Sequence, residues 1–263
     1  FLPYRKPKIL GSVKALPEIL LKRKYNHVLI ITDEGIMKLG LTKRLEKVLS
    51  ENNIKYTIYD KTVANPTTKN VAEAMDLFLS NNCNAIIGFG GGSSMDCAKA
   101  VGAKIAKPKQ PLSKMKGILK VHKRIPLLIA VPTTAGTGSE TTLAAVITDA
   151  ETRHKYAIND FPLIPRYAIL DPKVTLSLPP FITATTGMDA LTHAVEGYIT
   201  KAHNEISDMF HMKAIKMIFK YLPAAVNDKD SEAIDKMGMA QYIAGMGFSN
   251  VGLGIVHSMA HQL

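Results

Sequence analysis

The chain has 263 residues, of which 46% are hydrophobic, so it can bury a sizeable core and is not a small fold that depends on disulfides. Its formal net charge of +11 suggests a nucleic-acid binder, but the excess is concentrated between Cys97 and Ser139, a segment with prolines and no aromatic or acidic residues. We interpret its basic stretch as a solvated loop and expect no nucleic-acid partner. Two cysteines, no signal-peptide pattern and no apolar run of roughly 18 residues favour a cytoplasmic protein without a membrane segment.

The first part of the chain alternates β-rich apolar runs with amphipathic helical stretches. In the helix expected at 36–52, Leu39 and Leu45 are among the leucines that should face the core. Such alternation predicts βαβ units and a mainly parallel sheet. The expected strands are 27–33, 54–60, 85–89, 126–131, 145–149, 155–158 and 167–170, and the expected helices are 36–52, 65–81 and 93–106.

The pattern of apolar and polar residues changes after two adjacent prolines, Pro179 and Pro180. From there no β-rich run occurs, and three stretches (183–200, 205–222 and 231–248) have helical periodicity. We therefore predict an α/β domain at 1–178 and an all-α domain at 179–263.

A glycine-rich turn, residues 88–96 (GFGGGSSMD), follows one expected strand and begins the next helix. Glycine allows a phosphate to approach the backbone, and a helix N-terminus offers unpaired N–H groups and a positive dipole end. This context predicts phosphate binding, although the pattern is not the usual G-x-G-x-x-G. Helix capping by Ser93 and Asp96 is the simpler alternative for those two side chains.

Two other polar positions follow expected strands. The segment 132–140 (PTTAGTGSE) places hydroxyls and small residues at the end of a strand, where an open α/β sheet binds a dinucleotide. The alternative is that the segment is only a tight loop whose hydroxyls form turns. Asp33 could accept hydrogen bonds from an adenosine ribose and would repel a 2′-phosphate, which favours NAD over NADP. Asp33 could instead cap the next helix, so both alternatives stay open.

Two pairs of metal-capable side chains lie four residues apart: Asp189 with His193, and His257 with His261. On a helix this spacing puts both members of a pair on one face, and two facing helices would converge on a site for a divalent transition metal. Glu196 adds a third polar group to an otherwise apolar helix, which is costly unless a positive charge compensates it. The other five histidines lack such a partner and are interpreted as surface or structural residues: His27, His122, His154, His203 and His211.

Four segments together resemble the iron-containing (group III) alcohol dehydrogenase family, in character closest to its lactaldehyde reductase and propanediol dehydrogenase branch. They are 90–96 (GGGSSMD), 132–140 (PTTAGTGSE), 186–200 (TGMDALTHAVEGYIT) and 252–261 (GLGIVHSMAH), in the family's order. The resemblance implies a Rossmann-like dinucleotide-binding α/β domain followed by a helical metal-binding domain, an architecture like that of dehydroquinate synthase. It implies hydride transfer between NAD(H) and a primary or secondary alcohol or its aldehyde or ketone, with Fe²⁺, or Zn²⁺, as Lewis acid, and we expect a homodimer.

The resemblance also assigns roles to individual residues. Asp189, His193 and His257 are expected to be metal ligands. His261, which spacing alone would make a fourth ligand, is expected near the nicotinamide as a proton relay. The cofactor-binding residues that it implies are Asp33 at the ribose, Asn65, Gly90, Gly91, Gly92 and Ser93 at the pyrophosphate, Thr133, Thr134 and Thr137 around the phosphates and nicotinamide, and Lys155.

The sequence departs from the family pattern after the last histidine, because the family's fourth metal ligand would follow Leu263. We therefore expect either a longer product or a weakened, three-ligand site. The competing hypotheses are a catalytically impaired nucleotide-binding protein or fragment, and a zinc polyol dehydrogenase or dehydroquinate-synthase-like enzyme of the same fold. The motif at 187–193 does not favour the second of these.

Overall fold

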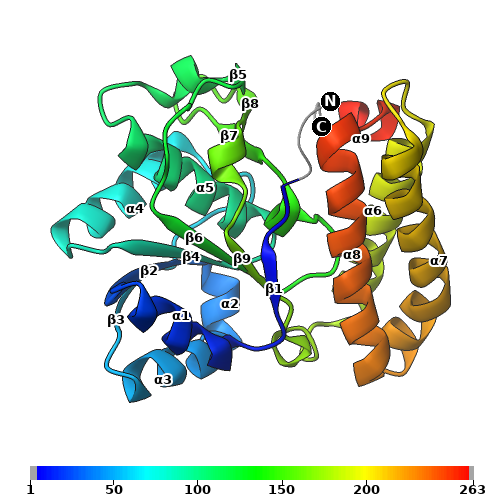
Figure 1. Cartoon of the computed structure of the whole chain (residues 1–263), viewed down its shortest axis with the longest axis horizontal. Coiled ribbons are helices and arrows are strands. Elements are labelled where there is room, and N and C mark those ends of the chain that lie inside the picture. The colour runs from blue at the N-terminus through cyan, green and yellow to red at the C-terminus, as the bar shows by residue number, and fades with distance from the viewer. Residues whose placement is uncertain (1–4, 261–263) are drawn as a thin grey trace. The chain divides into compact units, whose positions relative to one another are not determined.

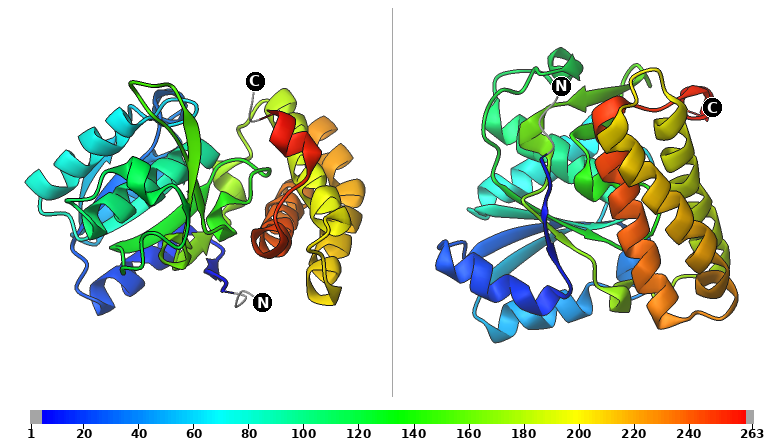
Figure 2. Two further views of the ribbon diagram at one scale, coloured as in Figure 1. Left: turned by 90° about the horizontal axis from the view of Figure 1, so that it is seen from above. Right: turned by 45° about the vertical axis from the view of Figure 1, so that its right-hand side comes forward.

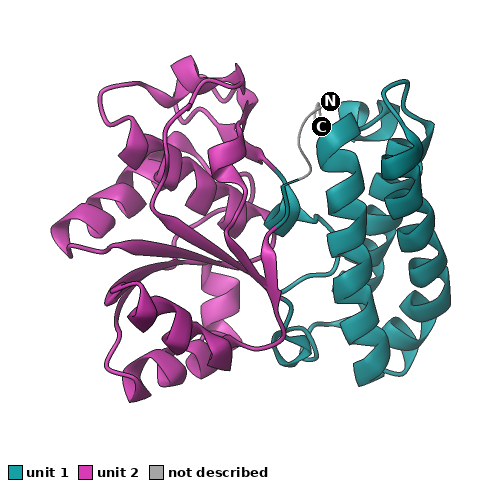
Figure 3. Cartoon of the chain, viewed as in Figure 1, with its two compact units in different colours: residues 1–6, 133–142, 170–263 teal, residues 7–132, 143–169 magenta. Residues whose placement is uncertain are grey.

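A computed structural model describes residues 5–260, whose contacts divide the chain into two compact units (Figure 3). The α/β unit comprises Pro7–Pro132 and Leu143–Ile169, and the helical unit comprises Phe1–Lys6, Thr133–Thr142 and Leu170–Leu263. The segment Thr133–Thr142, which follows a strand of the α/β unit, is thus grouped with the helices. The domain boundary expected between residues 178 and 179 stays a prediction.

The α/β unit is built on a six-stranded sheet in which every pairing is parallel, with strand order β1-β9-β6-β4-β2-β3 (Figure 1). The central strands are buried along nearly their whole length, as expected when both faces of a parallel sheet are covered. The sequence-based prediction of a parallel sheet is therefore confirmed. Its strands are β1 (Lys8–Leu10), β2 (His27–Ile31), β3 (Lys55–Tyr59), β4 (Ala85–Gly90), β6 (Leu127–Pro132) and β9 (Tyr167–Ile169).

The strand order contains a topological switch point between β2 and β4. From β2 the chain moves to β3 on one side, then returns past β2 to β4 and continues away to β6. Open α/β sheets bind ligands outside the carboxyl ends of the strands at such a point. Asp33 follows β2 and Gly90 ends β4, so two of the predicted cofactor positions lie at this edge of the sheet.

Helices cover both faces of the sheet, with α4 and α5 on one side and α1, α2 and α3 on the other (Figure 1). The single helix expected at 36–52 is wrong, because Gly40 adopts a φ of +65° and separates α2 from α3. Leu39 is consequently 56% exposed rather than directed to the core, whereas Leu45 is buried as expected. The helices are α1 (Leu16–Lys22), α2 (Glu34–Lys38), α3 (Lys43–Glu51), α4 (Thr68–Ser80) and α5 (Gly92–Ala106).

A second, three-stranded sheet belongs to the same unit, with order β5-β8-β7. The expected strand pair is confirmed: β7 (Ala144–Thr148) and β8 (Lys155–Asn159) are antiparallel. The basic segment is more ordered than a simple loop, because it contributes β5 (Gly117–Ile118) and the buried side chains of Leu112 and Met115. Its later part is fixed by Asp160, whose Oδ2 accepts hydrogen bonds from the backbone N–H groups of Val121 (2.8 Å) and His122 (2.9 Å).

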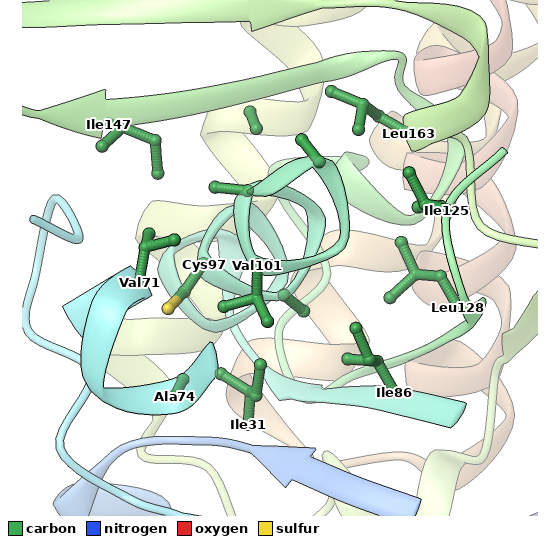
Figure 4. Packing of buried hydrophobic residues seen from close by; sticks show 14 of the residues in the cluster. Ile31, Val71, Ala74, Ile86, Cys97, Val101, Ile125, Leu128, Ile147 and Leu163 are labelled. Atoms are coloured by element: carbon green, nitrogen blue, oxygen red, sulfur yellow. The ribbon is translucent and has the colours of Figure 1, made fainter. Parts of the chain in front are cut away.

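The core of the α/β unit surrounds α5, as Figure 4 shows. Cys97 and Val101 on this helix pack among side chains from the sheet, α4 and the second sheet, including Ile31, Val71 and Ile147. Both cysteines are free and buried, and burial raises the pKa of the Cys97 thiol to about 12. This thiol is a packing element of the core.

The helical unit consists mainly of α6 (Pro180–Ile199), α7 (Glu205–Asn227) and α8 (Ser231–Val251), which run alongside one another (Figure 2), and the short α9 (Ile255–Ala260). The three expected helical stretches are confirmed. No helix in the described part of the chain is long and apolar enough to cross a membrane.

His211 of α7 lies buried in the packing of three helices, because Gly197 of α6 and Gly247 of α8 have no side chains where its ring lies. Within residues 5–260 neither of its ring nitrogens has a hydrogen-bond partner. Burial lowers the pKa of His211 to about 4, partly offset by Asp208, so the ring is neutral at pH 7. It is a structural residue, as the sequence analysis expected.

Replacing Asp160 by Ala should lower the free energy of unfolding by about 3 kcal/mol, because it leaves two backbone N–H groups without an acceptor, and Val121 is fully buried. Urea denaturation followed by circular dichroism measures the change. Asp76→Ala, at an exposed site on α4, is the control and should change stability little. Equal midpoints for the two variants would contradict the anchoring role of Asp160.

His211 should make stability fall as the pH drops from 6.5 towards 4, because the unfolded chain binds a proton there that the folded chain does not. Each such proton contributes a slope of about 1.4 kcal/mol per pH unit to the free energy of unfolding. His211→Gln removes this contribution, so its slope between pH 6.5 and 5 should be shallower than that of the unmodified chain. The exposed His122→Gln is the matched control, and equal slopes for the two variants would refute the assignment.

Candidate active site

The three predicted metal ligands meet in the helical unit. Asp189 and His193 lie one turn apart on α6, and His257 of α9 joins them, with one potential ligand atom of each residue within 4.8 Å of the other two. The Asp189 Oδ1 atom lies 3.5 Å from His257 Nε2 and 3.8 Å from His193 Nδ1. The i, i+4 spacing on α6 thus has the consequence that the sequence predicted, and the two motifs converge.

The surroundings of His193 keep its imidazole neutral. The side chain is buried, and its ring is stacked between those of Phe248 (centroids 4.4 Å apart) and His257 (4.3 Å). Burial lowers the pKa of His193 to about 4, with Asp189 opposing the shift and a backbone hydrogen bond to Gly136 also opposing it. The neutral imidazole is the form that binds metals.

His257 is held between two carboxylates. Its Nδ1 lies 2.5 Å from Glu196 Oε2, and its Nε2 faces Asp189. Burial lowers the pKa of His257, but hydrogen bonds and charge interactions with Asp189 and Glu196 outweigh it and raise that pKa. Burial likewise raises the pKa of Glu196, and hydrogen bonds from His257 and from backbone N–H groups more than compensate, so its pKa is lowered.

This donor set fits a divalent transition metal. Ligands at about 2.1 Å from a common centre lie about 3.4 Å apart, and the Asp189 oxygen lies 3.5 and 3.8 Å from the two imidazole nitrogens, close to that spacing. His193 Nδ1 is buried and has no hydrogen-bond partner within the described residues, so a metal ion would satisfy an otherwise unpaired acceptor. His261, the predicted proton relay, lies outside the described residues.

Three residues at this site have no individual role among the sequence-based predictions: Glu196, Phe248 and Gly136. Glu196 had a visible signal, since it lies three residues after His193 on an apolar helix. Phe248 and Gly136 had none, because their contacts with His193 depend on how α8 and the 133–142 segment pack.

The 133–142 segment packs closely on its own unit through glycines. A Cβ at Gly136 would lie 2.6 Å from the backbone oxygen of Thr186 on α6. Gly138 has a φ of +60°, and a Cβ there would lie 3.1 Å from the Cα of Gly245 on α8. The glycines of this motif therefore serve helix packing, a role that the sequence analysis did not consider.

The predicted cofactor residues of this segment differ in their local roles. The hydroxyls of Thr133 and Thr134 are buried without a hydrogen-bond partner among residues 5–260. Thr137 Oγ1 instead accepts a hydrogen bond from the backbone N–H of Ser139, which is a hydroxyl turn of the kind given as the alternative for this segment. Two unsatisfied hydroxyls are thus available to a polar ligand.

The glycine turn of the α/β unit has the geometry that phosphate approach requires. Gly90 adopts a φ of +147°, and a Cβ there would lie 2.5 Å from Ser94 Oγ. Gly91 is the N-cap of α5, with no side chain capping the helix, so capping by Ser93 and Asp96 is wrong. Gly92 is the first helical residue, and the backbone N–H groups of this first turn are available to an anion.

The remaining predicted cofactor residues of the α/β unit gather partly at this turn. Asp33 Oδ1 caps α2, and its Oδ2 accepts a hydrogen bond from Ser94, so the capping alternative is confirmed without excluding the other. The backbone N–H of Asn65 donates to Ser93 Oγ at 3.3 Å. Lys155 lies apart from these contacts, at the start of β8, where it pairs with Thr148.

The chain matches two family models: iron-containing alcohol dehydrogenase over residues 9–172, and the C-terminal part of the Fe-containing alcohol dehydrogenase family over residues 183–263. Over 254 residues, 96% of this chain and 66% of the relative, it is 40% identical to the NAD-dependent methanol dehydrogenase of Bacillus methanolicus. It is 39% identical, with the same coverage, to the lactaldehyde reductase of Escherichia coli K12.

Among solved structures, a crystal structure of 1,3-propanediol oxidoreductase superposes with a TM-score of 0.95 and 36% identity, over 100% of this chain and 70% of that one. The chain spans 57% to 66% of the lengths of the curated relatives that it matches first. The family models together cover nearly all of the chain, and the chain belongs to the iron-containing alcohol dehydrogenase family.

Proposed function

We propose that this chain takes part in NAD-dependent oxidation of a primary or secondary alcohol, or in the reverse reduction of its aldehyde or ketone. The observation that carries the proposal is the cluster of Asp189, His193 and His257, which is suited to a divalent metal. A bound Fe²⁺, or Zn²⁺, would supply Lewis acidity towards a substrate oxygen, while nicotinamide accepts or donates the hydride. The NAD-dependent methanol dehydrogenase and lactaldehyde reductase among the relatives support both the reaction class and the small-molecule substrates.

The protein groups at the metal cluster hold the ligands in the required state. Burial keeps His193 neutral, so its lone pair is available at physiological pH. Phe248 covers one face of that ring and limits the access of water. Asp189 supplies negative charge beside both imidazoles, which favours a cation over a neutral ligand. The role of His261 as a proton relay remains part of this proposal.

The nucleotide-binding part of the proposal rests on groups in each unit. Gly90, Gly91, Gly92 and Ser93 offer the pyrophosphate a close approach to the first turn of α5, with Asn65 beside them. Asp33 at the switch point can accept hydrogen bonds from a ribose and disfavours a 2′-phosphate. In the helical unit Thr133 and Thr134 have unsatisfied hydroxyls; Thr137 and Lys155 are included only from the family resemblance. The proposal also includes a cytoplasmic homodimer, for which the buried free cysteines support only the reducing compartment.

Asp189→Ala should weaken metal binding by more than about 100-fold, because it removes the negatively charged ligand, a larger loss than the 10–100-fold typical of an outer partner. Titration with Co²⁺ or Zn²⁺ by calorimetry measures the affinity, and NADH fluorescence should show nucleotide binding unchanged. Asp235→Ala, exposed on α8, is the control. Undiminished metal binding by the Asp189 variant would disprove the ligand assignment.

Gly90→Ala should reduce NADH affinity at least tenfold and leave Zn²⁺ affinity unchanged. A methyl group at a φ of +147° is strained and collides with Ser94 Oγ, so the turn before α5 must move. Gly11→Ala is the matched control, because no atom lies within 4 Å of the added Cβ. If both variants bind NADH like the unmodified chain, the turn is not the pyrophosphate site.

A further inference from the structure

Glu196 is buried, with 3% of the residue exposed, and its carboxylate lies against the segment that leads into α9. Its Oε1 accepts a hydrogen bond from the backbone N–H of Val256 at 2.6 Å, and its Oε2 accepts one from the N–H of Gly254 at 3.1 Å. The same Oε2 lies 2.5 Å from His257 Nδ1. The backbone N–H of His257 also donates to Oε2, at 3.5 Å. One side chain of α6 therefore binds three backbone groups and one side chain of a segment about 60 residues later.

Apolar packing contributes little to holding α9 in place. None of its six residues is buried, and Ile255, Val256 and Met259 are 73%, 48% and 58% exposed. A single isolated turn and a half of helix is unstable in water. Hydrogen bonds to a buried, ionised acceptor are among the strong ones, so Glu196 is well placed to fix the start of this helix.

The contact with Glu196 also determines which ring nitrogen of His257 carries hydrogen. An ionised carboxylate only accepts hydrogen bonds, so Nδ1 must be the protonated nitrogen in the neutral ring. Nε2 then keeps its lone pair, and it is Nε2 that faces Asp189 at 3.5 Å. The ring is thus oriented and in the correct tautomer for Nε2 to bind a cation beside Asp189.

We propose that Glu196 is a positioning residue that fixes the orientation and tautomer of His257 and thereby sets metal affinity. The proposal rests on the proposed function, because it takes Asp189, His193 and His257 as the metal ligands. Such outer partners of ligating histidines typically contribute 10–100-fold to metal affinity.

Glu196→Gln separates positioning from simple structural support. The amide is nearly isosteric, but it has one acceptor oxygen where the carboxylate has two, so it cannot accept all four hydrogen bonds. We expect Zn²⁺ and Co²⁺ affinity to fall 10–100-fold while the urea midpoint changes little. Glu232→Gln, at an exposed position in the first turn of α8, is the matched control and should bind both metals normally.

Two measurements on metal-free protein test the contact itself. Long-range ¹H–¹⁵N NMR should show the Nδ1–H tautomer of His257, or its doubly protonated form, in the unmodified chain, and a shift towards Nε2–H in Glu196→Gln. Hydrogen exchange at the Val256 amide should be faster in Glu196→Ala than in the unmodified chain.

The results distinguish the two proposals. If Glu196→Gln binds Zn²⁺ like the unmodified chain and keeps the same tautomer, the positioning role is refuted. If the unmodified chain binds metal no better than Asp189→Ala, the proposed function fails. In that case a comparison of the His257 tautomer in the unmodified chain and in Glu196→Gln still decides whether Glu196 positions the ring.

Discussion

A buried carboxylate is the constraint on which the candidate metal site depends. Glu196 is ionised in a mostly apolar helix, which is unfavourable unless donors replace the lost water. The donors come from residues 254–257. Their hydrogen bonds to Glu196 hold His257 next to α6, where Asp189 and His193 lie. The same contacts that satisfy this charge therefore hold the two motifs together.

The helical unit also ties the metal cluster to the 133–142 segment. Gly136 lies against the backbone of Thr186, and a backbone group of Gly136 opposes the lowering of the His193 pKa. The two unsatisfied threonine hydroxyls are two and three residues before Gly136. The proposed metal ligand and the proposed nucleotide contacts thus share one short stretch of backbone, and any displacement of that stretch affects both.

Much of the fold could be predicted because its signals are local. Apolar runs such as residues 28–31 predicted buried parallel strands, and the i, i+4 spacing of Asp189 and His193 predicted one helix face. The break at Gly40 was missed because the apolar pattern continues across it, and only a positive φ ends α2. The three-residue strand β1 was missed because it is too short for a periodic pattern and is stabilised by its pairing with β9. The roles of Glu196 and Phe248 depend on contacts with residues far away in the sequence, and a periodic pattern does not indicate such contacts.

The division of the chain into units has a consequence for how the protein is made. The ten residues Thr133–Thr142 belong to the helical unit, but they leave the ribosome before any residue of α6. During synthesis the contacts of Gly136 with α6 and of Gly138 with α8 cannot form until those helices have emerged, more than a hundred residues later in the case of Gly245. A fragment of the chain that ends at Ile169 contains all of the α/β unit together with this stretch of the helical unit, so neither unit corresponds to one uninterrupted piece of the chain.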